Sequence, residues 1–268
     1  MSSSLIRIRA LLRRFLYLHR RSLIRVFDVF FWPAMDLLVW GFLTLYIKEV
    51  AAGGPVARMI VFLIGAMISW DIHYRGQQAV TMALMEEIWT RNILNILISP
   101  LRLWEWVTAS FIYGFIKVAL VTLILAVIAQ ALYAFNILQI GWAFLPLAAN
   151  LLFFGWAIGL LTAGLLLRYG YSAEALIWGV PFLIQPFSCV FYPVSVLPVW
   201  AQWIARSFPT SYLFEGLRMT LRGDAIPGGL WLAVIGLNIF YIALGVWFFV
   251  WMFGRARASG HLSRLCQD

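Results

Sequence analysis

Charged residues are scarce in this chain of 268 residues. They make up 12% of the sequence, whereas hydrophobic residues make up 63%. An average soluble domain has roughly 25% charged residues, which keep its surface in contact with water. The composition therefore predicts an integral membrane protein rather than a soluble one.

Patterns that carry catalysis or bind nucleotides are also missing. Lysine occurs only as Lys48 and Lys117, and neither lies in a G-x-x-x-x-G-K-[ST] phosphate-binding loop. The three histidines are isolated and none precedes a glutamate, which excludes the H-E-x-x-H zinc pattern. Clustered aspartates for magnesium chemistry are absent as well. We therefore expect no enzyme, and no cofactor or metal bound by this chain.

Only two cysteines are present, Cys189 and Cys266. Cys189 falls within an apolar stretch and Cys266 near the end of the chain, so we expect them on opposite faces of a membrane. The sequence therefore predicts no disulfide within one chain.

Six apolar stretches approach or exceed the roughly 20 residues that a helix needs to cross a bilayer. They cover residues 28–47, 59–82, 106–133, 143–167, 175–192 and 230–253. We expect one all-α membrane domain over 1–268 with six transmembrane helices. Its parts are an interface helix (1–27), spans one to five (28–192), an outer re-entrant segment (193–229), span six (230–253) and a cytoplasmic tail (254–268).

The basic residues are distributed unevenly among the connecting segments. With both termini inside, thirteen arginines fall in cytoplasmic segments, and five arginines or lysines fall in outer ones. This asymmetry predicts cytoplasmic termini by the positive-inside rule. The net charge of +9 is then a sign of topology and of contact with membrane lipid, and nucleic acid is not expected as a partner.

The first 27 residues carry seven arginines on one side of a predicted helix, opposite an apolar face. This pattern is typical of an amphipathic helix that lies on the cytoplasmic face of the membrane. A basic membrane anchor is one interpretation, and an interface with a partner subunit, which the family resemblance given below implies, is the other. The residues singled out for the interface are Arg13, Arg14, Arg20 and Arg21.

Residues 85–106 join spans two and three and form a second amphipathic segment. Apolar residues recur at helical spacing, and Ser99 and Pro100 end the helix. An ordinary interfacial loop is one interpretation, and contact of the polar tips with a partner subunit, which the family resemblance given below implies, is the other. The candidate contact residues are Glu86, Glu87, Trp89, Arg91, Asn92, Ser99 and Pro100.

Several charged side chains fall inside the expected spans, where charge is costly and therefore needs a partner or a polar cavity. Asp71 and Arg75 are four residues apart, so they can form an ion pair on one helix. Two interpretations stay open, a neutralised pair packed against another helix and the polar lining of a translocation path. The candidate path residues are Asp36, Asp71, His73, Arg75, Phe191 and Tyr192.

The segment from 187 to 222 stays apolar and aromatic beyond the end of span five, although prolines interrupt it. Backbone broken at membrane depth needs protein or a cavity to satisfy its polar groups, so we expect a re-entrant helical hairpin. We expect Val196, Leu197, Trp200, Ile204 and Phe208 to be buried against spans five and six. The candidate gate residues are Pro193, Pro198, Trp200, Pro209, Glu215 and Arg218, the last two spaced to pair.

Two of these segments carry a resemblance to a known family. The run Y-P-x-S-x-L-P followed by P-T-S-Y-x-x-E-x-x-R resembles the segment before the last transmembrane helix of ABC-2 type transporter permeases. Arg91, followed by a helical stretch ending in S-P-L, resembles the coupling helix of these permeases. The chain departs from that pattern at Asn92, where a glycine is common.

The resemblance implies the permease subunit of an ABC exporter in the bacterial inner or plasma membrane. It implies a separate ATPase subunit that binds ATP and magnesium, and a second permease copy, most simply in a homodimer. Its cargo would be an amphiphilic drug, a lipid or a lipid-linked glycan. The alternative is an ion-coupled secondary transporter, which would work without an ATPase.

Overall fold

The computed structural model describes residues 3–50 and 54–258, and every regular element in these residues is a helix. The helices, in chain order, are α1 (Ser3–Arg20), α2 (Leu23–Val50), α3 (Gly54–Trp89), α4 (Ile93–Ile98), α5 (Leu103–Tyr133), α6 (Phe144–Tyr169), α7 (Ala175–Ile184), α8 (Val199–Ser207), α9 (Pro209–Arg222) and α10 (Gly228–Ala258). Short 3₁₀ helices lie between them: η1 (Ile137–Ala143), η2 (Gly170–Ala173), η3 (Gln185–Ser188) and η4 (Val194–Val196). The last ten residues of the expected tail, including Cys266, lie outside the described residues.

Four helical segments are long and apolar enough to cross a membrane. They are Leu23–Ile47, Leu103–Tyr133, Ile137–Ala173 and Gly228–Ala258. They correspond to expected spans one, three, four and six. The all-α class is confirmed, and the length and apolar composition of these four helices fit an integral membrane protein. For the other two expected spans, which correspond to α3 and to the shorter apolar stretch Ala175–Ser188, membrane crossing stays a prediction.

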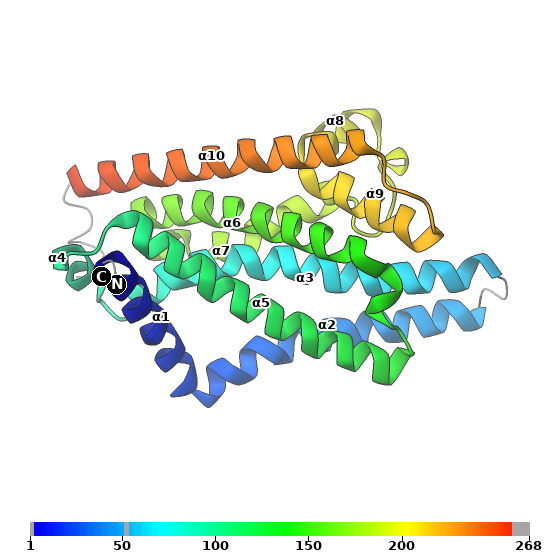
Figure 1. The fold of residues 1–268 in the computed structure, drawn as a ribbon, viewed down its shortest axis with the longest axis horizontal. Helices are drawn as coiled ribbons and strands as arrows, with labels where there is room; N and C mark the ends of the chain where they lie inside the picture. Colours follow the sequence, from blue (N-terminus) through cyan, green and yellow to red (C-terminus); the bar gives the residue numbers. More distant parts are fainter. Residues whose placement is uncertain (1–2, 51–53, 259–268) are drawn as a thin grey trace.

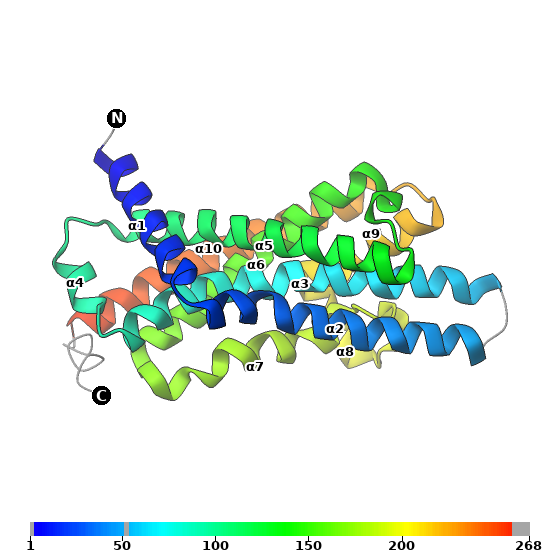
Figure 2. The ribbon, with the colours of Figure 1, turned by 90° about the horizontal axis from the view of Figure 1, so that it is seen from below.

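The long helices run side by side along the longest axis of the molecule (Figure 1). Helices α1 and α4 lie at one end, which we call the α4 end, together with the end of α10. The pair α8 and α9 lies toward the opposite end, which we call the α8 end, as Figure 2 also shows. The start of α1 and the end of α10 thus share one end of the molecule, as the expected topology requires. Which end faces the cytoplasm stays a prediction.

Helix α6 packs very closely against α3 and α10 because glycines replace side chains at the contacts. A Cβ atom on Gly155 would lie 2.5 Å from the carbonyl oxygen of His73, and one on Gly159 would lie 2.9 Å from that of Gln77. On the other side, a Cβ atom on Gly245 of α10 would lie 2.8 Å from the carbonyl oxygen of Ala157. Small residues spaced by four allow such backbone approach between membrane helices. Helices α3, α6 and α10 therefore form one tightly packed block.

Helix α1 packs onto this bundle at the α4 end, with its apolar face turned inward. Ile8, Leu11 and Phe15 are buried in a cluster with Met85 of α3 and Trp106 of α5. The expected amphipathic character of this segment is therefore present in the structure. Its apolar face packs on protein, whereas the sequence pattern predicted a helix that lies on the membrane surface.

Candidate functional site

A groove of about 930 Å³ lies on the side of α3 that faces α2, α5 and α7. Its lining follows α3 from Met67 to Trp89. At a rise of 1.5 Å per residue this is about 33 Å of helix, which is close to the ~30 Å thickness of a bilayer's hydrocarbon core. The groove therefore extends along α3 over a length comparable to a membrane.

The middle of the groove is polar. The Nε atom of Arg75 donates to the carboxylate of Asp71 at 2.8 Å, and the two side chains are 6% and 13% exposed. Asp36 of α2, Gln78 of α3 and Lys117 of α5 line the same groove. The structure thus brings together three of the predicted path residues, Asp36, Asp71 and Arg75, with Asp71 and Arg75 as an ion pair.

Aromatic rings surround this polar region. Trp40 of α2 stacks on Phe191 with ring centroids 4.2 Å apart, so the predicted path residue Phe191 does line the groove. Tyr192, by contrast, is not among the residues that line the groove. Its hydroxyl donates to the carbonyl oxygen of Pro186 at 2.7 Å and so stabilises the turn after α7.

His73, also predicted for the path, lies on the other side of α3. Its ring stacks on Phe154 of α6 at 5.0 Å between centroids, within the tightly packed block. Positions 71, 75, 78, 82 and 86 recur at helical spacing and share the groove face, whereas 73, 77 and 80 fall on the opposite face. The helical register therefore separates His73 from Asp71 and Arg75.

The amphipathic helix expected within residues 85–106 is divided in two by a turn. Helix α3 continues to Trp89, and Arg91 then takes a left-handed backbone conformation with a φ of 53°. Only Ile93–Ile98 forms α4. Asn92 precedes this short helix, and Ser99 and Pro100 follow it on the exposed surface. Trp89 lines the α4 end of the groove.

Glu86 and Glu87 are buried ion-pair partners, which corrects their interpretation as polar tips. Glu87 accepts a hydrogen bond from Arg14 of α1 at 2.6 Å, and Glu86 lies 3.5 Å from Arg25 of α2. Both residues follow the expected span 59–82, and burial raises the pKa of each carboxyl above its usual value. Among the arginines predicted for the interface, Arg14 makes this contact, whereas Arg13, Arg20 and Arg21 are exposed.

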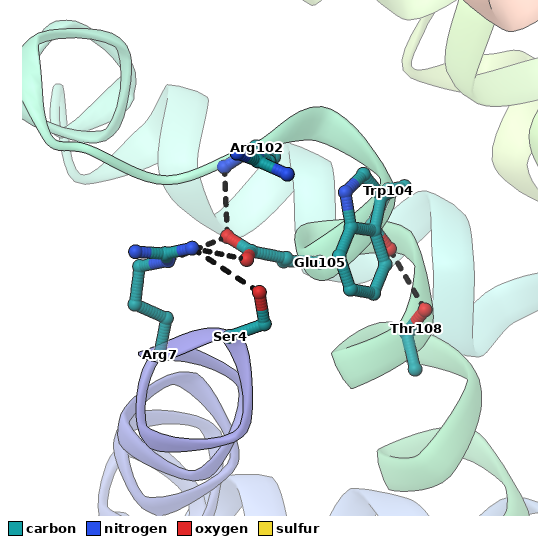
Figure 3. A network of polar contacts seen from close by, with 6 residues as sticks. All are labelled: Ser4, Arg7, Arg102, Trp104, Glu105 and Thr108. Atoms are coloured by element: carbon teal, nitrogen blue, oxygen red, sulfur yellow. Dashed lines mark hydrogen bonds and ion pairs between the residues drawn. The ribbon is translucent and has the colours of Figure 1, made fainter. Parts of the chain in front are cut away.

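A third carboxylate, Glu105 at the start of α5, also pairs with α1 (Figure 3). Arg7 donates to both of its oxygens, at 2.8 and 2.7 Å, and also contacts the hydroxyl of Ser4. The backbone N–H of Arg102 donates to the same carboxylate at 2.9 Å, as in a capping box. Neither Arg7 nor Glu105 was predicted as a site residue from the sequence, although a glutamate three residues into a helix is a recognised start signal.

At the α8 end, Arg218 of α9 connects several parts of the chain. It donates to Glu215 at 2.9 Å and to the carbonyls of Tyr192, at 2.6 Å, and Cys189. Its guanidinium also lies 4.7 Å from the ring centroid of Phe62 in α3. The pair between Glu215 and Arg218 is therefore present as predicted, and it fixes the turn that follows α7.

The expected hairpin of two short helices is present as α8 and α9, with Pro198 before α8 and Pro209 at the start of α9. Pro193 precedes the short turn η4. The expected burial of the apolar residues was wrong for Val196, Trp200 and Ile204, which are 67%, 64% and 37% exposed, whereas Leu197 and Phe208 are partly buried. Helix α8 buries its small residues, Ala201 and Ala205, against the protein and so turns its large side chains outward. Whether this hairpin enters a bilayer stays a prediction.

No protein-family model matches this chain, and no curated protein matches its sequence. Over residues 3–50 and 54–258, no three histidine, cysteine, aspartate or glutamate side chains are grouped so that they could hold a metal ion. The geometry of the groove and of the α4 end is therefore the basis for assigning a function.

Proposed function

We propose that this chain is the permease subunit of an ATP-driven exporter, and that an amphiphilic molecule moves along the groove beside α3. The observation that carries this proposal is the combination of length and polarity in the groove. A charged side chain inside a membrane is costly, and such residues usually mark a pathway or a partner. Here Asp36, Asp71, Arg75 and Lys117 all line one groove of about 930 Å³.

The chain would work in the inner or plasma membrane of a bacterium with six spans, α2, α3, α5, α6, α7 and α10. The resemblance to ABC-2 permeases supports this assignment and a cytoplasmic location for the α4 end. A second copy of the chain would close the groove, since one side of α2 carries large exposed apolar residues. They include Val39, Phe42 and Tyr46.

A separate ATPase subunit would bind at α4 and the turn around Arg91. The loop between α3 and α5 is tied to α1 on both sides, through Glu87 to Arg14 and through Glu105 to Arg7. A displacement of α4 would therefore be transmitted to α1, α3 and α5 together. Such a contact would couple ATP binding to a shift between inward-open and outward-open states.

The second candidate function is ion-coupled secondary transport. It is favoured by the ionisable groups in the middle of the groove, because proton and ion pathways use such residues. The two candidate functions can be distinguished by measurement, because an ATP-driven exporter needs an ATPase subunit and a secondary transporter does not.

The test is a purification of the tagged chain in mild detergent from membranes of its own cells. We expect a polypeptide with a G-x-x-x-x-G-K-[ST] loop and ATPase activity to co-purify with it. Arg91→Glu should reduce that recovery by about tenfold, which corresponds to about 1.4 kcal/mol of binding free energy. Arg222→Glu is the matched control, since it makes the same change at an exposed position of the α8 end.

Equal recovery of the ATPase with both variants would contradict docking at α4. Transport by the purified chain alone, driven by an ion gradient across liposomes, would instead support the secondary transporter.

A further inference from the structure

The charges that line the groove compensate one another. Three basic and three acidic side chains line it: Arg25, Arg75, Lys117, Asp36, Asp71 and Glu86. Four of these six form two ion pairs, Asp71 with Arg75 and Glu86 with Arg25. A ligand with a large net charge would therefore find no opposite charge in excess.

His19 of α1 also lines the groove, at its α4 end. Burial and the nearby Lys117 lower its pKa to about 4, so its imidazole is neutral at pH 7. It therefore leaves the balance of charges unchanged.

Gln78 contributes an unpaired hydrogen-bond donor to this lining. It is 7% exposed, and its Nε2 atom is buried without a hydrogen-bond partner among the described residues. Gln78 shares the groove face of α3 with Asp71 and Arg75. A buried amide donor is costly when unpaired, so a ligand that offers it an acceptor gains affinity.

Asp36 offers the opposite kind of group, since its carboxylate only accepts hydrogen bonds when it is ionised. A hydroxyl both donates and accepts, so several hydroxyls on one head group can satisfy Gln78 and Asp36 together. A phosphate oxygen can serve only the amide, and an ammonium group can serve only the carboxylate. The chemistry of the lining therefore favours hydroxyls.

Aromatic side chains line the groove on either side of this polar region. Trp32 of α2 and Trp178 and Phe182 of α7 are exposed and line it. Such rings offer flat apolar surfaces to a ligand. The volume of about 930 Å³ lies within the range of small-molecule sites, which combine apolar walls with a few polar groups.

We propose that the groove binds an amphiphile whose head group is uncharged and rich in hydroxyls, that is, a glycosylated lipid. Gln78 donates to a hydroxyl oxygen, Asp36 accepts from a hydroxyl, and the rings contact the apolar faces of the sugar and the start of the lipid chain. This inference rests on the proposed function for the role of the groove, and it names the class of substrate.

The experiment is a lipid competition on the full chain in nanodiscs. The bilayer contains equal amounts of monoglucosyldiacylglycerol, phosphatidylcholine and phosphatidylglycerol with identical acyl chains, and native mass spectrometry identifies the lipid retained on the released protein. We expect the glucosyl lipid to be retained several-fold over the other two. Gln78→Leu should reduce that preference about three- to tenfold, because one hydrogen bond is lost with little change in volume.

Gln77→Leu is the matched control. Gln77 is the same residue type, is also buried, and has an amide without a partner among the described residues, but it lies on the α6 side of α3. It should leave the preference unchanged. In addition, Asp36→Asn gives the groove one excess positive charge and should shift retention toward phosphatidylglycerol.

Preferential retention of phosphatidylcholine or phosphatidylglycerol by the unmodified chain would overturn the proposal. So would the same glucosyl-lipid preference in both glutamine variants, or no retained lipid at all. None of these outcomes depends on an ATPase. A failure here is therefore distinguishable from a failure of the ATPase to co-purify, which would overturn the proposed exporter instead.

Discussion

The two faces of α3 are built in opposite ways. The face toward α6 is tightly packed, and Gly155 and Gly159 bring the two backbones into contact beside the buried His73 and Gln77. The face toward α2 and α7 borders a groove and carries an ion pair and an amide. Helix α3 thus has the tightly packed block on one side and a polar groove on the other.

This difference shows how a long, mostly apolar helix can hold charged groups. Asp71 and Arg75 neutralise each other within one helix and face a groove that can admit water or ligand, so their desolvation is incomplete. On the other face, close packing leaves no room for a ligand. We therefore expect mutations on the two faces to have different consequences.

The largest effect is expected for Arg75→Met, which leaves the mostly buried carboxylate of Asp71 without its partner. Breaking one side of such a pair costs about 3 kcal/mol of stability. The double variant Asp71→Leu with Arg75→Met removes both charges and should regain most of that loss. The measurement is thermal unfolding in detergent. A double variant as unstable as the single one would mean that the pair is not a self-contained unit.

The next effect is expected for Gly155→Ala on the packed face. The added methyl would lie 2.5 Å from a backbone oxygen, so α3 and α6 must separate, at a cost of about 1–3 kcal/mol. Gly236→Ala in α10 is the control, because no atom beyond the neighbouring backbone of its own helix lies within 4 Å of a Cβ built there. That variant should be neutral or slightly stabilising. If both alanines are tolerated equally, the block is less tightly packed than described.

The smallest effect is expected for the pH dependence of His19. Its pKa is about 4 in the folded protein, against an ordinary value of 6.5. Between these values the unfolded chain binds the proton and the folded chain does not, so stability falls as the pH falls from about 6.5 toward 4.

The measurement is the unfolding temperature between pH 7 and pH 5. Glu86 and Glu87 act in the opposite direction, because burial raises the pKa of each. They are present in both proteins, so the difference between the unmodified chain and His19→Phe isolates the histidine. The His19→Phe variant should lose less stability than the unmodified chain when the pH falls from 7 to 5. Identical pH profiles would show that His19 is not buried as a neutral group.

Much of the fold was predictable from the sequence because long apolar stretches are a strong signal. The helical class, four spans, the amphipathic α1 and the two short helices after α7 all follow from hydropathy and from proline positions. The pairs of Asp71 with Arg75 and of Glu215 with Arg218 were also predictable, since residues three or four apart on a helix are neighbours.

The remaining features depend on contacts between distant segments. Nothing local to Glu87 or Glu105 indicates that arginines of α1, 73 and 98 positions away, hold them. The break at Arg91 depends on a left-handed backbone conformation, which arginine does not signal. The exposure of Trp200 follows from how α8 rests on the bundle, which its own periodicity does not determine.

We infer that the groove face of α3 is open to water along its length, whereas water does not reach its α6 face. The direct test places single cysteines at Met67, Met82 and Val80 after Cys189 and Cys266 are replaced, and measures their reaction with a small water-soluble thiol reagent in proteoliposomes. Met67 and Met82 line the groove, whereas Val80 is fully buried beside Gly159. We predict rapid reaction at 67 and 82 and almost none at 80. Equal reaction at the three positions, or reaction at none of them, would contradict the claim.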